Sequence, residues 1–175
     1  MQQALLSYLK QPTLANFLAL RSAHLAQEDL NPYSVKLVPV AHHLAAGKFR
    51  EAADLISQCL IPDYLLSAGT HLELAVAHKG LGCPEKAEFE RFLAEKLVIG
   101  IEMTGQGGER RPFLVTRTSD EYDFLIYRKQ SPLIQAQVER GARLLDRIET
   151  QSGEVFWFDI TEIHELTQRI RPGKG

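Results

Sequence analysis

Apolar residues recur every three or four positions through the first hundred residues, which is the spacing of amphipathic helices. Thr13 is a suitable N-cap at the start of one of them. Pro39 falls inside another, which must therefore be kinked or begin later than the pattern alone suggests. The pattern predicts helices over residues 2–10, 14–27, 34–46, 49–60, 65–79 and 84–103. The first part of the chain is therefore expected to be a series of helical hairpins.

After Gly105 the pattern changes to short apolar runs that are separated by turn residues. It predicts strands over 113–116, 133–138, 142–150 and 154–160, with helices over 120–128 and 161–170. The last of these strands is apolar on both faces, so we expect it to be central or covered on both sides. The five residues that end the chain carry no apolar side chain, and we expect them to fray.

Helices first and a small antiparallel sheet afterwards predict an α+β fold rather than alternating βαβ units. We expect a helical array over residues 1–104 and a small α+β region, packed on the helices, over 105–175.

One helical hairpin is written twice, with repeats at about residues 34–62 and 64–103. A period near 34 residues, with glycine at the turn and alanine at the helix crossing, is typical of tetratricopeptide (TPR) repeats. Three pairs of identical residues stand 35 positions apart, namely Gly47 and Gly82, Ala52 and Ala87, and His43 and His78. This part of the chain therefore resembles a pair of TPR repeats.

Two short segments in the second half extend the resemblance. Asp120-Glu121-Tyr122 and the aromatic run 155–160 follow the helices and a glycine-rich turn. In this order they are similar to the bacterial domain-of-unknown-function family 4919, over roughly residues 30–160. That resemblance implies a fold and no activity.

Composition narrows the classes of partner. Apolar residues make up 45% of the chain and charged residues 24%, as in an ordinary globular protein. A net charge of −2 gives no electrostatic reason to expect nucleic acid or an anionic membrane as a partner. No apolar run approaches the ~20 residues of a membrane span, and the first residues lack the pattern of a signal peptide.

The chemistry-bearing residues do not form a known catalytic or metal motif. Cys59 and Cys83 have no CxxC spacing, and we interpret them as small packed residues of a reducing, cytoplasmic compartment. Hydrolase and P-loop signatures are absent from the sequence. His71 and His78 would lie about 10.5 Å apart along a helix axis, too far to share one zinc ion. We therefore predict no metal and no cofactor.

The first helix of each repeat is the place to look for a binding groove. Some TPR domains clamp a carboxylate there with Lys and Asn, but the matching positions hold Leu37 and Ala41, then Leu72 and Val76. Such an apolar surface needs a cover. The candidate covers are the sheet around residues 156–158, a partner helix, or a second copy of the chain. Around this groove we select four polar residues as candidate contacts, namely Lys36, His42, His71 and Lys79.

The loop from Gly105 to Arg111 is a second candidate site. Glycines let backbone N–H groups approach an anion, and Arg110 and Arg111 could bind a phosphate or a carboxylate. The alternative is a plain glycine helix end, because the loop follows a helix, where the dipole is negative.

These observations favour a non-enzymatic interaction or scaffold protein, which holds a protein or peptide against the groove or the exposed sheet edge. Homo-oligomerisation is one form that such an interaction could take. The alternative is an enzyme or small-ligand sensor with an anion site at the helix–sheet junction, where Arg110, Arg111, Glu121 and Asp123 would supply charge. A deep polar pocket at that junction would favour the alternative, and a solid apolar junction with a shallow groove elsewhere would favour the scaffold.

Overall fold

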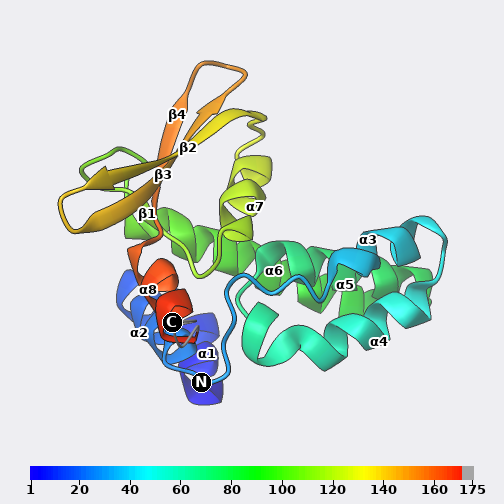
Figure 1. Cartoon of the computed structure of the whole chain (residues 1–175). Coiled ribbons are helices and arrows are strands. Elements are labelled where there is room, and N and C mark those ends of the chain that lie inside the picture. The colour runs from blue at the N-terminus through cyan, green and yellow to red at the C-terminus, as the bar shows by residue number, and fades with distance from the viewer. Residues whose placement is uncertain (171–175) are drawn as a thin grey trace, which may run out of the picture.

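The helices of the first part begin and end close to where the apolar pattern places them. The computed structural model describes residues 1–170, so the expected fraying of the last five residues lies outside the described part. It shows an α+β fold with the helices first and the sheet afterwards, as predicted (Figure 1). The N-terminal helices are α1 (Gln2–Lys10), α2 (Leu14–Leu25), α3 (Val38–Ala45), α4 (Phe49–Cys59), α5 (Ala68–Gly80) and α6 (Pro84–Thr104).

Local chemistry explains where these helices start. Oγ1 of Thr13 accepts a hydrogen bond from the Asn16 N–H and caps α2, as predicted. Pro39 lies in the first turn of α3, so that helix begins at Val38 rather than at residue 34. Ser67 caps α5 and delays its start to Ala68.

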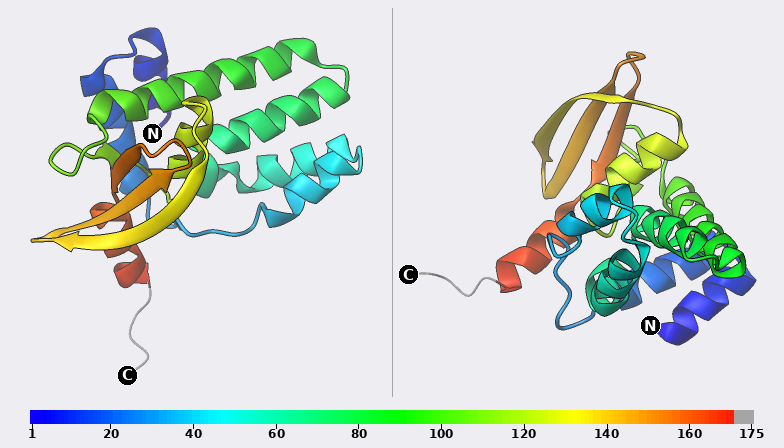
Figure 2. Two further views of the ribbon diagram at one scale, coloured as in Figure 1. Left: turned by 90° about the horizontal axis from the view of Figure 1, so that it is seen from above. Right: turned by 90° about the vertical axis from the view of Figure 1, so that its right-hand side faces the viewer.

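The hairpins α3–α4 and α5–α6 are built alike. Gly47 and Gly82 have φ values of +69° and +72°, a left-handed conformation that glycine adopts without strain. After each glycine the next N–H reaches back to a histidine carbonyl, from Lys48 in one hairpin and from Cys83 in the other. Ala52 and Ala87 are both buried, so the paired helices approach closely at equivalent points. Figure 2 shows the four helices running side by side. A short kinked segment, η1 (Leu60–Tyr64), joins the two hairpins.

The second part adds one small sheet and two helices. Its elements are β1 (Phe113–Leu114), α7 (Ser119–Tyr127), β2 (Pro132–Arg140), β3 (Arg143–Thr150), β4 (Val155–Asp159) and α8 (Thr161–Ile170). The strand order is β1-β4-β3-β2, and β2, β3 and β4 are antiparallel as predicted. The short strand β1 pairs with β4 in parallel, which makes the sheet mixed. The connection through α7 carries the chain from one edge of the sheet to the other, and two hairpins then bring β4 back beside β1.

The position of β4 confirms the first of the two predicted alternatives, a central strand, and the strand is not covered on both sides. β4 is an inner strand, and its Phe156 and Phe158 are buried against Phe124 of α7, with ring centroids 6.2 and 5.8 Å away. On the other face Trp157 is half-buried and Val155 is 36% exposed. Cover on one side is therefore enough for this strand.

The described residues form two apolar cores. One lies inside the hairpins, where α3, α4, η1 and α5 meet. The other joins α1 and α2 to α6, α7, the sheet and α8, and includes Tyr8, Leu97 and Phe158. The first two helices thus share a core with the C-terminal region, across the boundary expected at residue 104. Arg21 of α2 also donates to the Val115 carbonyl and forms an ion pair with Glu162 of α8, and Figure 1 shows α1, α2 and α8 gathered together.

Candidate binding groove

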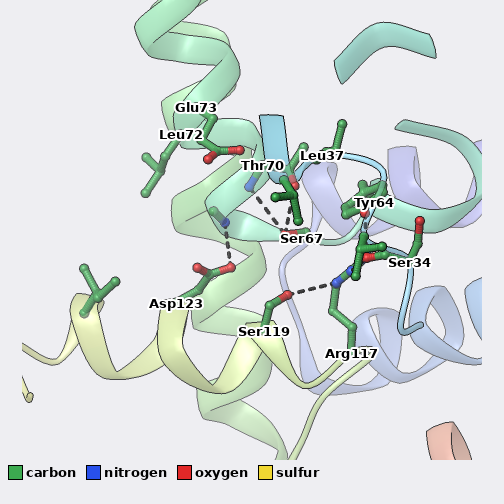
Figure 3. A pocket seen from close by; sticks show the side chains of 14 residues that line it. Ser34, Leu37, Tyr64, Ser67, Thr70, Leu72, Glu73, Arg117, Ser119 and Asp123 are labelled. Carbon is green, nitrogen blue, oxygen red and sulfur yellow. Dashed lines mark hydrogen bonds between the residues drawn. The ribbon is translucent and has the colours of Figure 1, made fainter. Parts of the chain in front are cut away.

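An open cavity of about 380 Å³ lies where the hairpins meet α7. Residues 34–38 form one wall, the first turns of α5 form the second, and residues 117–126 form the third. Figure 3 shows it with Glu73 and Leu72 on α5 and Asp123 on α7. We call this cavity, with the apolar residues around its mouth, the groove.

The mouth of the groove is apolar and open to solvent. Val35 and Val38 are each 73% exposed, Leu72 is 45% exposed and Ile126 of α7 is 67% exposed. Val76, one turn further along α5, extends the apolar surface and is 48% exposed. Part of this surface is the one that the repeat pattern places on the first helix of each hairpin.

The sheet does not cover that surface, contrary to one of the expectations. Phe156 and Phe158 pack instead with Phe113 and Phe124 inside the core that the sheet shares with α7. The buried face of β4 packs against α7, which lies between the sheet and α5 (Figure 1). A partner or a second copy of the chain remains as a cover.

The floor of the groove is held by a buried arginine that the sequence analysis did not select. Arg117 is 6% exposed and donates to the carbonyl of Asp63 at 2.9 Å and to that of Ser34 at 3.0 Å. Its Nε donates to Oγ of Ser119, and its guanidinium lies 4.0 Å from the centre of the Tyr64 ring. One side chain thus fastens α7 to both the loop before α3 and the kink before α5.

A buried aspartate completes this junction. Asp63 Oδ1 accepts from the Asn31 N–H at 2.9 Å, and Oδ2 accepts from Lys36 Nζ at 3.1 Å. The hydrogen bond to Asp63 raises the pKa of Lys36. Lys36, one of the candidate groove residues, stands between Val35 and Leu37, which line the cavity. Its ammonium group is paired with Asp63.

Two carboxylates line the other side of the groove. Asp123 of α7 accepts a 2.7 Å hydrogen bond from the Gly69 N–H in the first turn of α5. Glu73 lies one turn further along α5, and burial together with the charge of Asp123 raises its pKa to about 6. Burial also raises the pKa of Asp123, while the Gly69 hydrogen bond and Arg117 act against that rise.

The other acidic residues of α7 point elsewhere. Asp120 accepts from the backbone and hydroxyl of Thr116, and burial raises its pKa to about 7. Glu121 faces the sheet, where Gln135 Nε2 donates both to it and to Asp146 of β3. Burial and Asp146 raise the pKa of Glu121 far above its usual range. The enzyme hypothesis expects Glu121 and Asp123 to lie in one site. The structure instead places Glu121 against the sheet and Asp123 against α5.

His71 is placed inside the helical layer. It is 2% exposed, with Nδ1 2.6 Å from Glu90 Oε2 and Nε2 3.0 Å from the Leu65 carbonyl oxygen. It joins α5 to α6 and cannot contact a partner at the surface, which corrects its selection as a groove residue. His42 on α3 and Lys79 near the end of α5 are exposed, and neither lines the cavity.

The glycine-rich loop lies apart from the groove. Arg110 and Arg111 are exposed, and the loop is closed by hydrogen bonds from the Gln106 N–H to the Arg111 carbonyl and from the Arg111 N–H to the Gly108 carbonyl. Glu109 pairs with Arg140 at the end of β2. The two candidate sites are therefore separate, and the structure brings neither arginine to the groove.

Sequence reasoning missed Arg117, Glu73 and Ile126. Phe124, Leu125 and Ile126 are consecutive apolar residues, so one of them had to face outward from a helix. That signal was present for Ile126. Nothing in the sequence pattern distinguishes Arg117 or Glu73 from the other charged residues, because their places depend on contacts between distant segments.

No cluster of metal-binding side chains is present in the part of the chain that the structure describes. Within residues 1–170, no group of three or more His, Cys, Asp or Glu side chains could hold a metal ion. In the same range, no helix is both long and apolar enough to cross a membrane. Cys59 and Cys83 are free thiols and are partly buried.

Comparisons with models of known families, with curated proteins and with solved structures found no match. The resemblances to TPR repeats and to domain-of-unknown-function family 4919 therefore stay predictions. The α+β fold and the groove are the findings on which a function has to be argued.

Proposed function

We propose that this chain is a non-enzymatic interaction protein that holds a segment of another protein in the groove between α3, α5 and α7. The observation that supports the proposal most is the row of exposed apolar residues at the mouth, formed by Val35, Val38, Leu72, Val76 and Ile126. Contiguous apolar surface of this kind marks interaction sites. A groove between helices suits an extended or helical peptide.

The polar groups beneath the groove support binding better than catalysis. Arg117 donates its hydrogen bonds to two backbone carbonyls and a serine hydroxyl. The carboxylate of Asp63 accepts hydrogen bonds from Asn31 and Lys36. A catalytic acid, base or nucleophile has to be free to reach a substrate. Arg117 and Asp63 are occupied in holding the fold, so an enzyme or a ligand sensor at this junction would depend on Glu73 and Asp123 alone and is the weaker proposal.

The edge strand β2 is the competing docking surface. Among residues 1–170 it pairs only with β3, and Leu133 and Ile134 are 60% and 54% exposed. Pro132 at its start and Glu139 and Arg140 at its end are residues that discourage edge pairing. The groove has five exposed large apolar residues, against two, Leu133 and Ile134, on β2. We also propose a reducing, cytoplasmic location, because both cysteines are unpaired.

A peptide-display selection tests the proposal. The selection uses immobilised wild-type protein, and the enriched peptides are then tested on Leu72→Glu/Val76→Glu. The matched control is Phe89→Glu, which also charges an apolar residue that is 54% exposed, but on α6. We expect peptides that bind the wild type and the Phe89→Glu control and fail to bind the groove variant. Peptides that bind all three proteins equally, or no enrichment on a correctly folded wild type, would overturn the proposal.

A further inference from the structure

The groove contains two carboxylates that form no ion pair with a described residue. Glu73 is half-buried, and its side chain forms no hydrogen bond and no ion pair with any of residues 1–170. Asp123 uses Oδ2 for the Gly69 N–H, whereas its Oδ1 accepts no hydrogen bond from a described residue. Glu73 and Asp123 therefore line the same cavity from two different helices, each with at least one carboxylate oxygen that has no described partner.

The nearby cations offset this charge only in part, because the charge of Arg117 opposes the rise in the pKa of Asp123 without forming an ion pair with it. Arg117 lines the cavity, but its donors point to the carbonyls of Ser34 and Asp63 and to Ser119. Lys36 is bound to Asp63. The cavity wall thus carries two carboxylates against one guanidinium that is already engaged. Like charges held close together in a half-buried place are costly unless a counter-charge joins them.

A third polar group in the cavity also lacks a partner. Ser34 is 7% exposed and lines the cavity, and its Oγ forms no hydrogen bond with any described residue. Buried hydroxyls are normally paired, so an unpaired one marks a place where a partner atom is expected. The hydroxyl can accept or donate, and it suits a backbone group of a bound segment.

We propose that the segment held in the groove carries a lysine or arginine side chain flanked by apolar residues. Its cationic head lies between Glu73 and Asp123, and its apolar neighbours cover Leu72, Val76 and Ile126. This inference rests on the proposed function, because it names the class of segment that the same groove binds.

The chemistry of such a side chain fits the groove in two ways. Its aliphatic stem can lie along the apolar mouth while the charged head reaches the carboxylates. Hydrogen bonds between a cation and a carboxylate are stronger than neutral ones. The groove would in turn reject segments with an acidic residue at that position, because they would add a third negative charge.

The first arm of the test varies the peptide. Peptides enriched on the wild-type protein are synthesised with a fluorescent label, and their basic residue is replaced by methionine or by glutamate. We expect methionine to weaken binding by at least about tenfold, the loss of one charge-assisted hydrogen bond at the low end of its usual range, and glutamate to weaken it further. Enriched peptides that lack a basic residue, or that bind equally well with methionine, would overturn the inference.

The second arm varies the protein. Glu73→Gln and Asp123→Asn remove the charges, and Asn keeps an oxygen that can accept from the Gly69 N–H, so the fold is retained. We expect the preference for lysine over methionine to vanish on the double variant. If Leu72→Glu/Val76→Glu abolishes binding while the double variant keeps that preference, the groove function stands and this inference falls.

A third arm asks whether the cation must belong to a protein. Spermidine alone is titrated into the wild type in competition with the labelled peptide. We expect it to compete weakly, because it has no apolar flanks to cover the mouth. Displacement of the peptide by spermidine at the peptide's own concentration would replace the protein segment with a small organic cation and overturn the inference.

Discussion

Asp123 of α7 caps the N-terminus of α5 by accepting a 2.7 Å hydrogen bond from the backbone N–H of Gly69. The approach is so close that a Cβ added at residue 69 would lie 2.4 Å from the Asp123 carboxylate. A side chain at this position would therefore have to displace the Asp123 carboxylate, so the contact between the two helices favours glycine. The same contact sets α7 beside α5 and so creates one wall of the groove.

Gly69→Ala should destabilise the protein, although alanine is the better helix former. Alanine in a helix gains up to about 1 kcal/mol over glycine. Displacing Asp123 loses a hydrogen bond to a charged group, worth about 1.5–3 kcal/mol. We expect a net loss of about 1 kcal/mol in the free energy of unfolding, measured by urea denaturation.

The control for this prediction is the same substitution in an Asp123→Ala background. Without the carboxylate there is nothing for the new methyl group to displace, so Gly69→Ala should there be neutral or stabilising. If alanine costs the same free energy in both backgrounds, the contact between Gly69 and Asp123 is not what favours glycine.

Arg117→Lys should weaken the junction beneath the groove. Lysine cannot supply the planar fork that reaches Ser34, Asp63 and Ser119 together. We expect the free energy of unfolding to fall by about 2 kcal/mol, as seen by chemical denaturation. Arg110→Lys, on an exposed loop residue, is the matched control and should change stability by less than about 0.5 kcal/mol. Equal effects of the two substitutions would contradict the role given to Arg117.

Stability should fall as the pH rises above 7, because of Glu121. Burial and Asp146 raise its pKa, so the folded protein keeps a proton that the unfolded chain releases. Stability then decreases with pH, at most by about 1.4 kcal/mol per pH unit for one proton. Asp120, with its pKa raised to about 7, acts in the same direction at lower pH. His24, with its pKa lowered to about 4, acts oppositely below about pH 6.5.

The window from pH 7 to pH 9 therefore isolates Glu121 from Asp120 and His24. Glu121→Gln is the control, because the amide stays neutral and still meets Asp146 of β3 and Gln135 of β2. We expect the variant to lose most of the slope and to be more stable than the wild type at pH 8.5. A wild-type stability that is flat or rising across this window, in urea titrations, would refute the assignment.

Binding in the groove should have its own pH dependence. Glu73 has a pKa raised to about 6 in the free protein, with Asp123 of α7 as the neighbouring acid and Arg117 on the cavity wall. A bound cation favours the charged form of Glu73, so affinity for a lysine-containing peptide should fall as the pH drops from 7.5 to 5. Fluorescence anisotropy should show this fall in the wild type and a smaller one in Glu73→Gln.

Much of the fold could be predicted from local signals. The spacing of Gly47 and Gly82 predicts two equivalent turns, and both glycines have the left-handed conformation of such turns. Thr13 caps its helix, and α8 spans the residues predicted for it. These features depend on neighbouring residues, so the sequence pattern carries them.

The features that failed depend on contacts between distant segments. The parallel pairing of β1 with β4 follows from the path of the chain through α7, which no local pattern shows. His71 looked like a groove residue because its helix was right, but its ring faces Glu90 of α6. Glu121 and Asp123 are two positions apart, and only the packing of α7 shows that one faces the sheet and the other faces α5.

Chemical-shift mapping by NMR tests the central claim most directly. Isotope-labelled wild-type protein is titrated with a peptide enriched by display, and the perturbed backbone amides are located. We predict that they cluster at Leu72, Glu73, Val76, Asp123 and Ile126, around the groove. Perturbations confined to β2, or to the face of α6 that carries Phe89, would show that the segment binds elsewhere and would contradict the account.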